Sequence, residues 1–177
     1  MIHKARGFTI VELLVVIVVI GILATISVIS YNNVAAKARD AQRLQDIKTI
    51  SKALELYYLD NGRFPPSACG TSCPSPKSIN SSWLTTSDGS WSLLEEALVP
   101  NYISALPKDP RAAVGTPAAI YNGYNYDYVL STWCGAAHGR LFLLTYRLET
   151  MPRQNEISGN CASNAPSYAS SQYVSVK

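Results

Sequence analysis

An uninterrupted apolar segment near the N-terminus constrains this chain more than any other feature. Residues 8–29 read FTIVELLVVIVVIGILATISVI, and Glu12 is the only charged side chain among them. In an α-helix these residues extend about 33 Å, which is enough to cross the hydrocarbon core of a bilayer. A carboxylate inside such a segment is costly, so Glu12 is a candidate functional residue. The sequence therefore predicts a membrane-spanning helix that carries one functional acid.

The segment before this apolar run is short and basic. Residues 1–7 read MIHKARG, and the run begins directly after Gly7. A secretory signal peptide has a shorter apolar core that is followed, not preceded, by its cleavage site. An uncleaved signal anchor is the alternative, and the acid at Glu12 disfavours it. In both cases the positive-inside bias keeps the basic segment in the cytoplasm and places the rest of the chain outside.

The hexapeptide Gly7-Phe8-Thr9-Ile10-Val11-Glu12 resembles the processing site of type IV pilins and the related pseudopilins. The resemblance implies that a prepilin peptidase cleaves after Gly7 and that the new N-terminal amine of Phe8 is methylated. It also implies that Glu12 of one subunit meets the Phe8 amine of its neighbour during filament assembly. Two later segments, LELYYLDNGRFP at 54–65 and LPKDP at 106–110, resemble the helix exit and a loop of the same family.

Gly21 lies inside the apolar run. A glycine in a membrane helix permits close approach of another helix. The family resemblance implies a second role, in which the helix unwinds at this glycine on assembly. Many pilins pair that glycine with a later proline, whereas residues 27–30 read SVIS here. Both roles of Gly21 stay open.

Helical periodicity continues beyond the apolar run. The chain has no proline between Phe8 and Arg63, which predicts one helix of about 50 residues. Residues 8–30 form its transmembrane or filament-core half, and residues 31–62 form an amphipathic half that ends with Gly62 as the C′ residue. The predicted apolar face of the second half consists of Val34, Ala38, Ala41, Leu44, Ile47, Ile50 (or Ser51), Leu54 and Tyr57. Asp40, Arg43 and Asp46 are predicted on the polar faces, as an i,i+3 ladder.

Residues 63–177 are predicted to form a globular head after the leader (1–7) and the helix. Residues 66–90 are expected to be a loop, and a capping box from Ser92 to Glu95 is expected to open a short helix. Residues 124–130 alternate apolar and polar for most of their length, which predicts a strand. A second strand is expected at 140–148, and a late strand at 172–176. The fold class is therefore α+β, with the outer half of a long helix packed on a small antiparallel sheet. The pilin resemblance implies the same lollipop arrangement.

All four cysteines, Cys69, Cys73, Cys134 and Cys161, lie on the exported side of the predicted membrane helix. An even number of cysteines outside the cytoplasm suggests disulfides. We favour the pairs Cys69–Cys73 and Cys134–Cys161, while the two other pairings stay open. The alternative is a zinc site made of Cys134, His138 and Cys161, whose spacing fits no standard zinc finger.

Other chemistry has little support in the sequence. It contains no nucleophile elbow, P-loop or zincin motif, so we expect neither an enzyme nor a cofactor. Asp109, Asp127 and Glu149 could contribute to a calcium site of the kind that the resemblance to major pseudopilins implies. No spaced acidic loop is visible, so no metal is expected. The net charge is only +3 and lysines and arginines do not cluster, so no direct nucleic-acid site is evident.

The interpretation is a structural subunit of a type IV pilus, a homo-oligomer that polymerises through its N-terminal helix. The resemblance implies a surface filament (a fimbrium) used for adhesion, twitching motility or DNA uptake, with its surface or host target left open. It implies as partners prepilin peptidase, the inner-membrane assembly platform, the assembly ATPase and, before assembly, membrane lipid. The subunit would cross the cytoplasmic membrane once and then leave it for the extracellular filament. The alternatives are a major pseudopilin of a type II secretion system and a bitopic membrane protein that presents a binding domain.

Overall fold

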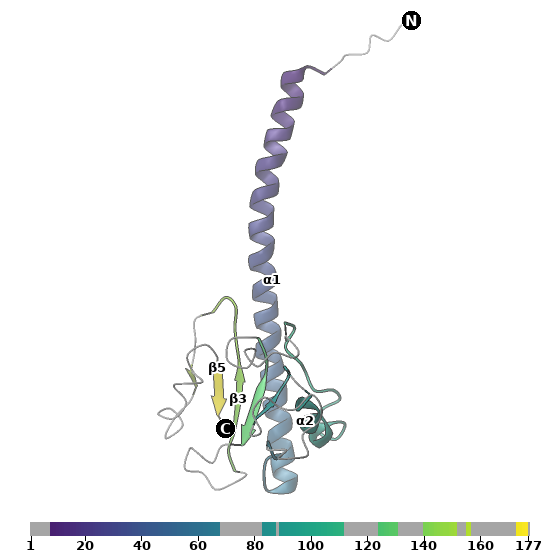
Figure 1. Cartoon of the computed structure of the whole chain (residues 1–177), viewed down its shortest axis with the longest axis vertical. Helices are drawn as coiled ribbons and strands as arrows, with labels where there is room; N and C mark the ends of the chain where they lie inside the picture. Colours follow the sequence, from purple (N-terminus) through teal and green to yellow (C-terminus); the bar gives the residue numbers. More distant parts are fainter. Residues whose placement is uncertain are drawn as a thin grey trace, which may run out of the picture. The chain divides into compact units, whose positions relative to one another are not determined.

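The computed structural model describes residues 8–67, 83–87, 89–111, 124–130, 140–151, 155–156 and 173–176. The chain forms two compact units, Met1–Ala38 and Arg39–Lys177. Helix α1 (Ile10–Asn61) begins in the first unit and ends in the second (Figure 1). Its 52 residues confirm the single long helix that the sequence predicts.

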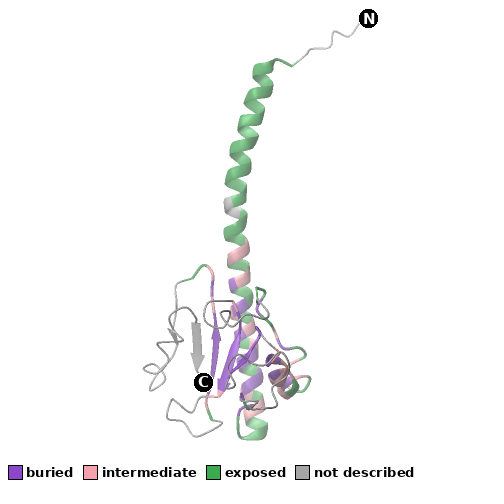
Figure 2. Ribbon diagram, in the orientation of Figure 1, coloured by how far each residue is buried: buried purple, intermediate pink, exposed green. Residues whose placement is uncertain are grey.

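In the first unit, α1 presents apolar side chains to its surroundings. Every residue from Phe8 to Val28 is exposed (Figure 2). Within the described residues α1 is the one helix long and apolar enough, by its length and composition, to cross a membrane. An apolar surface of this extent is unfavourable in water, so this unit requires lipid or other protein around it.

The C-terminus of α1 is closed as the sequence predicts. Gly62 follows the last helical residue with φ of +68°, the left-handed conformation that glycine adopts at least cost. The Gly62 N–H donates to the Tyr58 carbonyl oxygen over 2.8 Å, which is the bond of an αL cap. The chain therefore leaves the helix at the predicted position.

The second unit contains a five-stranded sheet. Its strands are β1 (Leu84–Thr85), β2 (Asp127–Leu130), β3 (Phe142–Tyr146), β4 (Asn155–Glu156) and β5 (Tyr173–Val176). Their order is β1-β2-β3-β5-β4, and neighbours are antiparallel except for β4, which runs parallel to β5. The register pairs Tyr128 of β2 with Leu144 of β3.

The core lies where β2 and β3 pack against α1 between Arg39 and Asn61. Figure 2 shows buried residues on both strands and on the adjoining side of the helix. The helix contributes Ile47, Ile50, Ala53 and Leu54, and the strands contribute Tyr128, Phe142, Leu144 and Tyr146. The Tyr128 hydroxyl also donates to the Pro65 carbonyl oxygen over 2.6 Å. The fold class is therefore α+β, as the sequence predicts.

Helix α2 (Trp91–Leu98) packs into the same core through Trp91, Leu94 and Leu98. Its predicted capping box is wrong. The N-cap is Ser90, and its hydroxyl accepts the Thr85 N–H over 3.0 Å instead of capping the helix. Ser92 lies one residue inside the helix, where its hydroxyl donates to the Gly89 carbonyl oxygen. The contact between Ser90 and β1 decides this arrangement, and the local motif does not contain it.

The strand predictions have mixed outcomes. Strands β2, β3 and β5 confirm the predicted regions, but β2 and β3 are shorter than expected. Strand β1 falls in a segment predicted as loop, so that prediction is wrong, and β4 was not anticipated. The four cysteines and His138 lie outside the described residues. The disulfide pairs and the zinc alternative therefore stay predictions.

Candidate functional site

The start of α1 is a reciprocal capping box between Thr9 and Glu12. The backbone N–H and the hydroxyl of Thr9 each donate to Glu12 Oε2 over 2.8 Å. In return, the Glu12 N–H donates to Thr9 Oγ1 over 3.3 Å. The spacing T-x-x-E is the sequence signature of this motif. Sequence reasoning identified Glu12 but missed Thr9, although the signature was present.

The capping box fixes where the Glu12 carboxylate lies. Both Thr9 donors bind Oε2, so Oε1 is used by neither of them. The carboxylate lies in the first turn of α1, where a negative charge is stabilised by the helix dipole. Phe8 is 86% exposed beside it, while Gly7 lies outside the described residues.

Gly21 is not required by packing within the subunit. Helix α1 runs through it without a break, and a Cβ added there would meet no atom within 4 Å. The two predicted roles, close packing and unwinding, both concern the assembled state, so they stay predictions.

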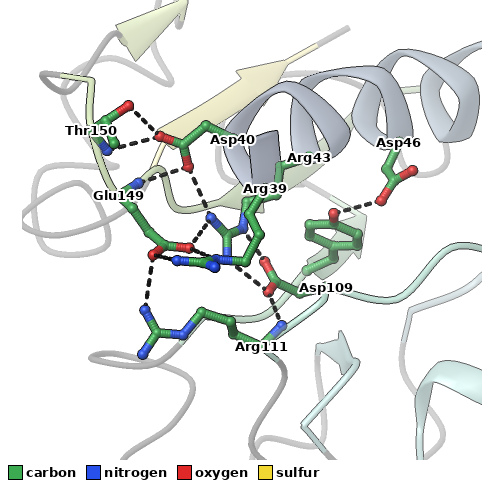
Figure 3. A network of polar contacts seen from close by, with 9 residues as sticks. Arg39, Asp40, Arg43, Asp46, Asp109, Arg111, Glu149 and Thr150 are labelled. Atoms are coloured by element: carbon green, nitrogen blue, oxygen red, sulfur yellow. Dashed lines mark hydrogen bonds and ion pairs between the residues drawn. The ribbon is translucent and has the colours of Figure 1, made fainter. Parts of the chain in front are cut away.

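The second unit contains a buried cluster of charges centred on Arg43 (Figure 3). Arg43 Nε and Nη2 donate to the two oxygens of Asp109 over 2.7 and 3.2 Å. Arg43 Nη1 donates to Asp40 over 2.9 Å and to Glu149 over 2.8 Å. The assignment of Asp40 and Arg43 to the polar faces is therefore wrong, since both are 0% exposed. Conversely, the first residues of the predicted apolar face are exposed, namely Val34, Ala38 and Ala41.

Asp40 binds the turn after β3 as well as Arg43. Its Oδ1 accepts the Glu149 N–H, and its Oδ2 accepts both the N–H and the hydroxyl of Thr150, each over 2.8 Å. The i,i+3 pair with Arg43 is present as predicted, but Asp46 bonds elsewhere, to the Tyr126 hydroxyl over 2.8 Å. Asp40 thus fastens a distant turn to α1.

Glu149 is held by three arginines. Arg39 binds it through two bonds of 2.7 and 2.6 Å, Arg43 through one, and Arg111 through one of 3.0 Å. The bonds from Arg39, followed by those from Arg43 and Arg111, lower the pKa of Glu149 to about 2 against the opposing effect of burial. Burial also acts to raise the pKa of Asp40, but its hydrogen bonds to Glu149, Thr150 and Arg43 outweigh that effect and lower it. Both acids are therefore ionised at neutral pH.

One aromatic ring covers the cluster. The guanidinium carbon of Arg43 lies 4.6 Å from the ring centre of Tyr124, and those of Arg111 and Arg147 lie 4.6 and 5.2 Å away. Such contacts are attractive because the face of the ring is electron-rich. Tyr124 therefore helps to keep the arginines in place.

The three acids considered as calcium ligands have other partners. Asp109 and Glu149 bind arginines, and Asp127 accepts hydrogen bonds from the Asn125 amide and, over 3.0 Å, from the Thr145 hydroxyl. Across the described part of the chain, no group of three His, Cys, Asp or Glu side chains is placed to hold a metal ion. These acids do not fit a calcium site.

Comparison with known proteins bears on the N-terminal site and on the whole chain. The family described as the prokaryotic N-terminal methylation motif matches residues 2–28. Type II secretion system core protein G of Escherichia coli (strain K12) is 34% identical over 116 residues, which cover 60% of this chain and 67% of that protein. The chain belongs to the type IV pilin and pseudopilin family.

Two other relatives in this family carry the same name. Type II secretion system core protein G of Aeromonas hydrophila is 34% identical over 116 residues, covering 61% of this chain and 68% of that protein. The protein of that name from Dickeya chrysanthemi is 27% identical over 167 residues, covering 89% and 87%. No solved structure matches the chain. The protein is thus a pilin-like structural subunit and not an enzyme.

Proposed function

We propose that this protein is a major pseudopilin of a type II secretion system. The observation that carries the proposal is the shared name of its relatives, type II secretion system core protein G, at up to 34% identity. The sequence alone favoured a type IV pilus and kept the pseudopilin as an alternative. The relatives support that alternative over a filament for adhesion or twitching motility.

The proposed pathway begins in the inner membrane. The apolar part of α1 anchors the precursor, prepilin peptidase removes residues 1–7, and the amine of Phe8 is methylated. The assembly platform and its ATPase then move the subunit into a short periplasmic filament. Two features support this sequence of events: the methylation motif at residues 2–28 and the fully exposed apolar surface of α1 in the first unit.

Glu12 has two proposed roles on this pathway. Within the subunit its Oε2 caps α1 through Thr9. In the filament its carboxylate binds the Phe8 ammonium of a neighbouring subunit. An unpaired charge buried among apolar helices costs several kcal/mol, so each of the two charges stabilises burial of the other.

The test is deletion of the gene in the source organism. We expect exported enzymes to accumulate in the periplasm, while surface filaments and twitching persist, and plasmid-borne protein should restore secretion. Normal secretion with loss of surface filaments would instead assign the subunit to a type IV pilus. An unprocessed N-terminus with neither defect would favour the bitopic membrane protein.

A further inference from the structure

Three segments that are distant in the sequence contribute one carboxylate each to the cluster around Arg43. Asp40 lies on α1, Asp109 in the loop after α2, and Glu149 in the turn after β3. Arg43 contacts all three acids at 2.7–2.9 Å, and its side chain is fully buried. A cation is therefore needed at this point, because three adjacent buried carboxylates without one would repel each other strongly.

Every oxygen of the three carboxylates already accepts a hydrogen bond. Asp40 Oδ1 accepts hydrogen bonds from Arg43 and from the Glu149 N–H, and Asp40 Oδ2 accepts them from the N–H and the hydroxyl of Thr150. Asp109 Oδ2 accepts a hydrogen bond from Arg43 Nε, and Asp109 Oδ1 accepts from Arg43 Nη2 and from the Arg111 N–H. Glu149 Oε1 accepts hydrogen bonds from Arg39 and Arg43, and Glu149 Oε2 accepts them from Arg39 and Arg111. A calcium ion needs six to eight oxygen ligands, and binding here would break these bonds.

The charges of the cluster are balanced without a metal. The ion pairs join three arginines, Arg39, Arg43 and Arg111, to three acids, Asp40, Asp109 and Glu149, so three positive charges oppose three negative ones. A guanidinium stays protonated at any physiological pH, and its planar fork suits bidentate carboxylate binding. A divalent cation at the same point would meet a fixed positive charge instead of free acids.

We propose that Arg43 is the resident cation of the second unit, and that this unit folds and stays folded without calcium. The guanidinium joins α1, the loop after α2 and the turn after β3 by pairing with one carboxylate from each, as a bound divalent ion would. The inference concerns the isolated subunit and holds whichever filament the subunit builds.

The first test uses the full-length chain in detergent micelles. Thermal unfolding is followed by near-ultraviolet circular dichroism, in millimolar calcium and in excess EGTA. We expect the same Tm in both conditions. A Tm that falls on chelation and recovers with added calcium would overturn the proposal.

The second test compares two arginines of the cluster. Arg43→Gln removes the central cation. The matched variant Arg39→Gln removes a cation whose side chain is 33% exposed and which forms an ion pair with Glu149 alone among the three acids. We expect Arg43→Gln to lower Tm well below that of Arg39→Gln, with or without calcium. Equal Tm values would overturn the central role of Arg43.

A milder pair covers the case in which Arg43→Gln does not fold. Arg43→Lys keeps the charge but loses the fork that binds Asp109 through two bonds. Its Tm should lie below that of Arg39→Lys, and equality of the two would again contradict the proposal. Because these measurements use purified protein, they are independent of the secretion test.

Discussion

At the scale of single residues, the second unit contains ionised side chains that are fully removed from water. Asp40 and Arg43 are both 0% exposed. Burying an ion costs several kcal/mol, and only good geometry with satisfied hydrogen bonds offsets that cost. Here Asp40 accepts four hydrogen bonds, two of them from backbone N–H groups. The cluster should therefore tolerate the loss of Asp40 or Arg43 poorly.

Asp40→Asn should lower the free energy of unfolding by about 3–5 kcal/mol, because it leaves Arg43 undercompensated and turns two acceptor sites into a donor group. Asp46→Asn is the matched control on the same helix, since Asp46 accepts one hydrogen bond, from the Tyr126 hydroxyl. Its cost should be about 1 kcal/mol. Denaturant unfolding followed by tryptophan fluorescence measures both, and similar losses would show that Asp40 has no special role.

The depressed pKa values predict a loss of stability in acid. Glu149 has a pKa of about 2 in the fold and an ordinary value of 4.5 when unfolded. Its contribution is fully present above the unfolded pKa and is lost as pH falls from 4.5 towards 2. The loss should be on the order of 3 kcal/mol for Glu149 alone, and Asp40 adds to it in the same direction. Unfolding free energies across this range should fall steeply for wild type and less for Glu149→Gln; parallel curves would contradict the assignment.

At the scale of elements, α1 has chemically defined ends. The Thr9–Glu12 capping box satisfies donors at its start, and Gly62 satisfies the Tyr58 carbonyl at its end. Between them, residues up to Val28 are exposed, while Ile47, Ile50 and Leu54 lie in the core. One continuous helix thus serves two different environments.

Gly62→Ala should destabilise the second unit by about 1 kcal/mol, because an alanine is strained at a φ of +68°. Gly21→Ala is the matched control, since its φ is not positive and an added Cβ there meets no atom within 4 Å. Its thermal unfolding in micelles should equal that of wild type. If Gly62→Ala melted like Gly21→Ala, the left-handed C-cap would not contribute to stability.

At the scale of the whole molecule, the two units differ in whether their apolar residues are buried within the subunit. The second unit buries its own core of apolar and aromatic side chains. The first unit buries none of its apolar residues from Phe8 to Val28. The apolar surface of the first unit is therefore shielded from water only in lipid or beside other subunits. This agrees with a protein that passes from the membrane into a filament.

Glu12→Val should insert into the membrane and be cleaved after Gly7, but it should assemble few filaments. In a filament of this variant, the Phe8 ammonium would be buried without a carboxylate partner, at a cost of several kcal/mol per subunit. Glu12→Gln separates charge from capping, because glutamine preserves the capping box. Filament yield with N-terminal sequencing is the measurement. Failure of both variants supports the charge pair, whereas normal assembly of Glu12→Gln would assign Glu12 to capping alone.

The sequence by itself determined the features whose causes are local. The apolar run, the absence of proline up to Arg63 and the glycine at 62 predicted α1 and its end, because helix periodicity and backbone conformation act over a few residues. The methylation motif and Glu12 were visible for the same reason. Alternating apolar and polar residues located β2, and the strand predicted at 140–148 contains β3.

Only the tertiary structure decided which charges are buried. Arg43 meets acids that lie 66 and 106 residues further along the chain, so its spacing on α1 cannot distinguish a surface ladder from a buried cluster. Strand β1 has two residues and is defined by pairing with β2, and Ser90 binds β1 instead of capping α2. For Arg43 and for β1 the deciding partner is remote in sequence. The partner of Ser90 is only five residues away, but it lies on β1, which is itself defined by its pairing with β2.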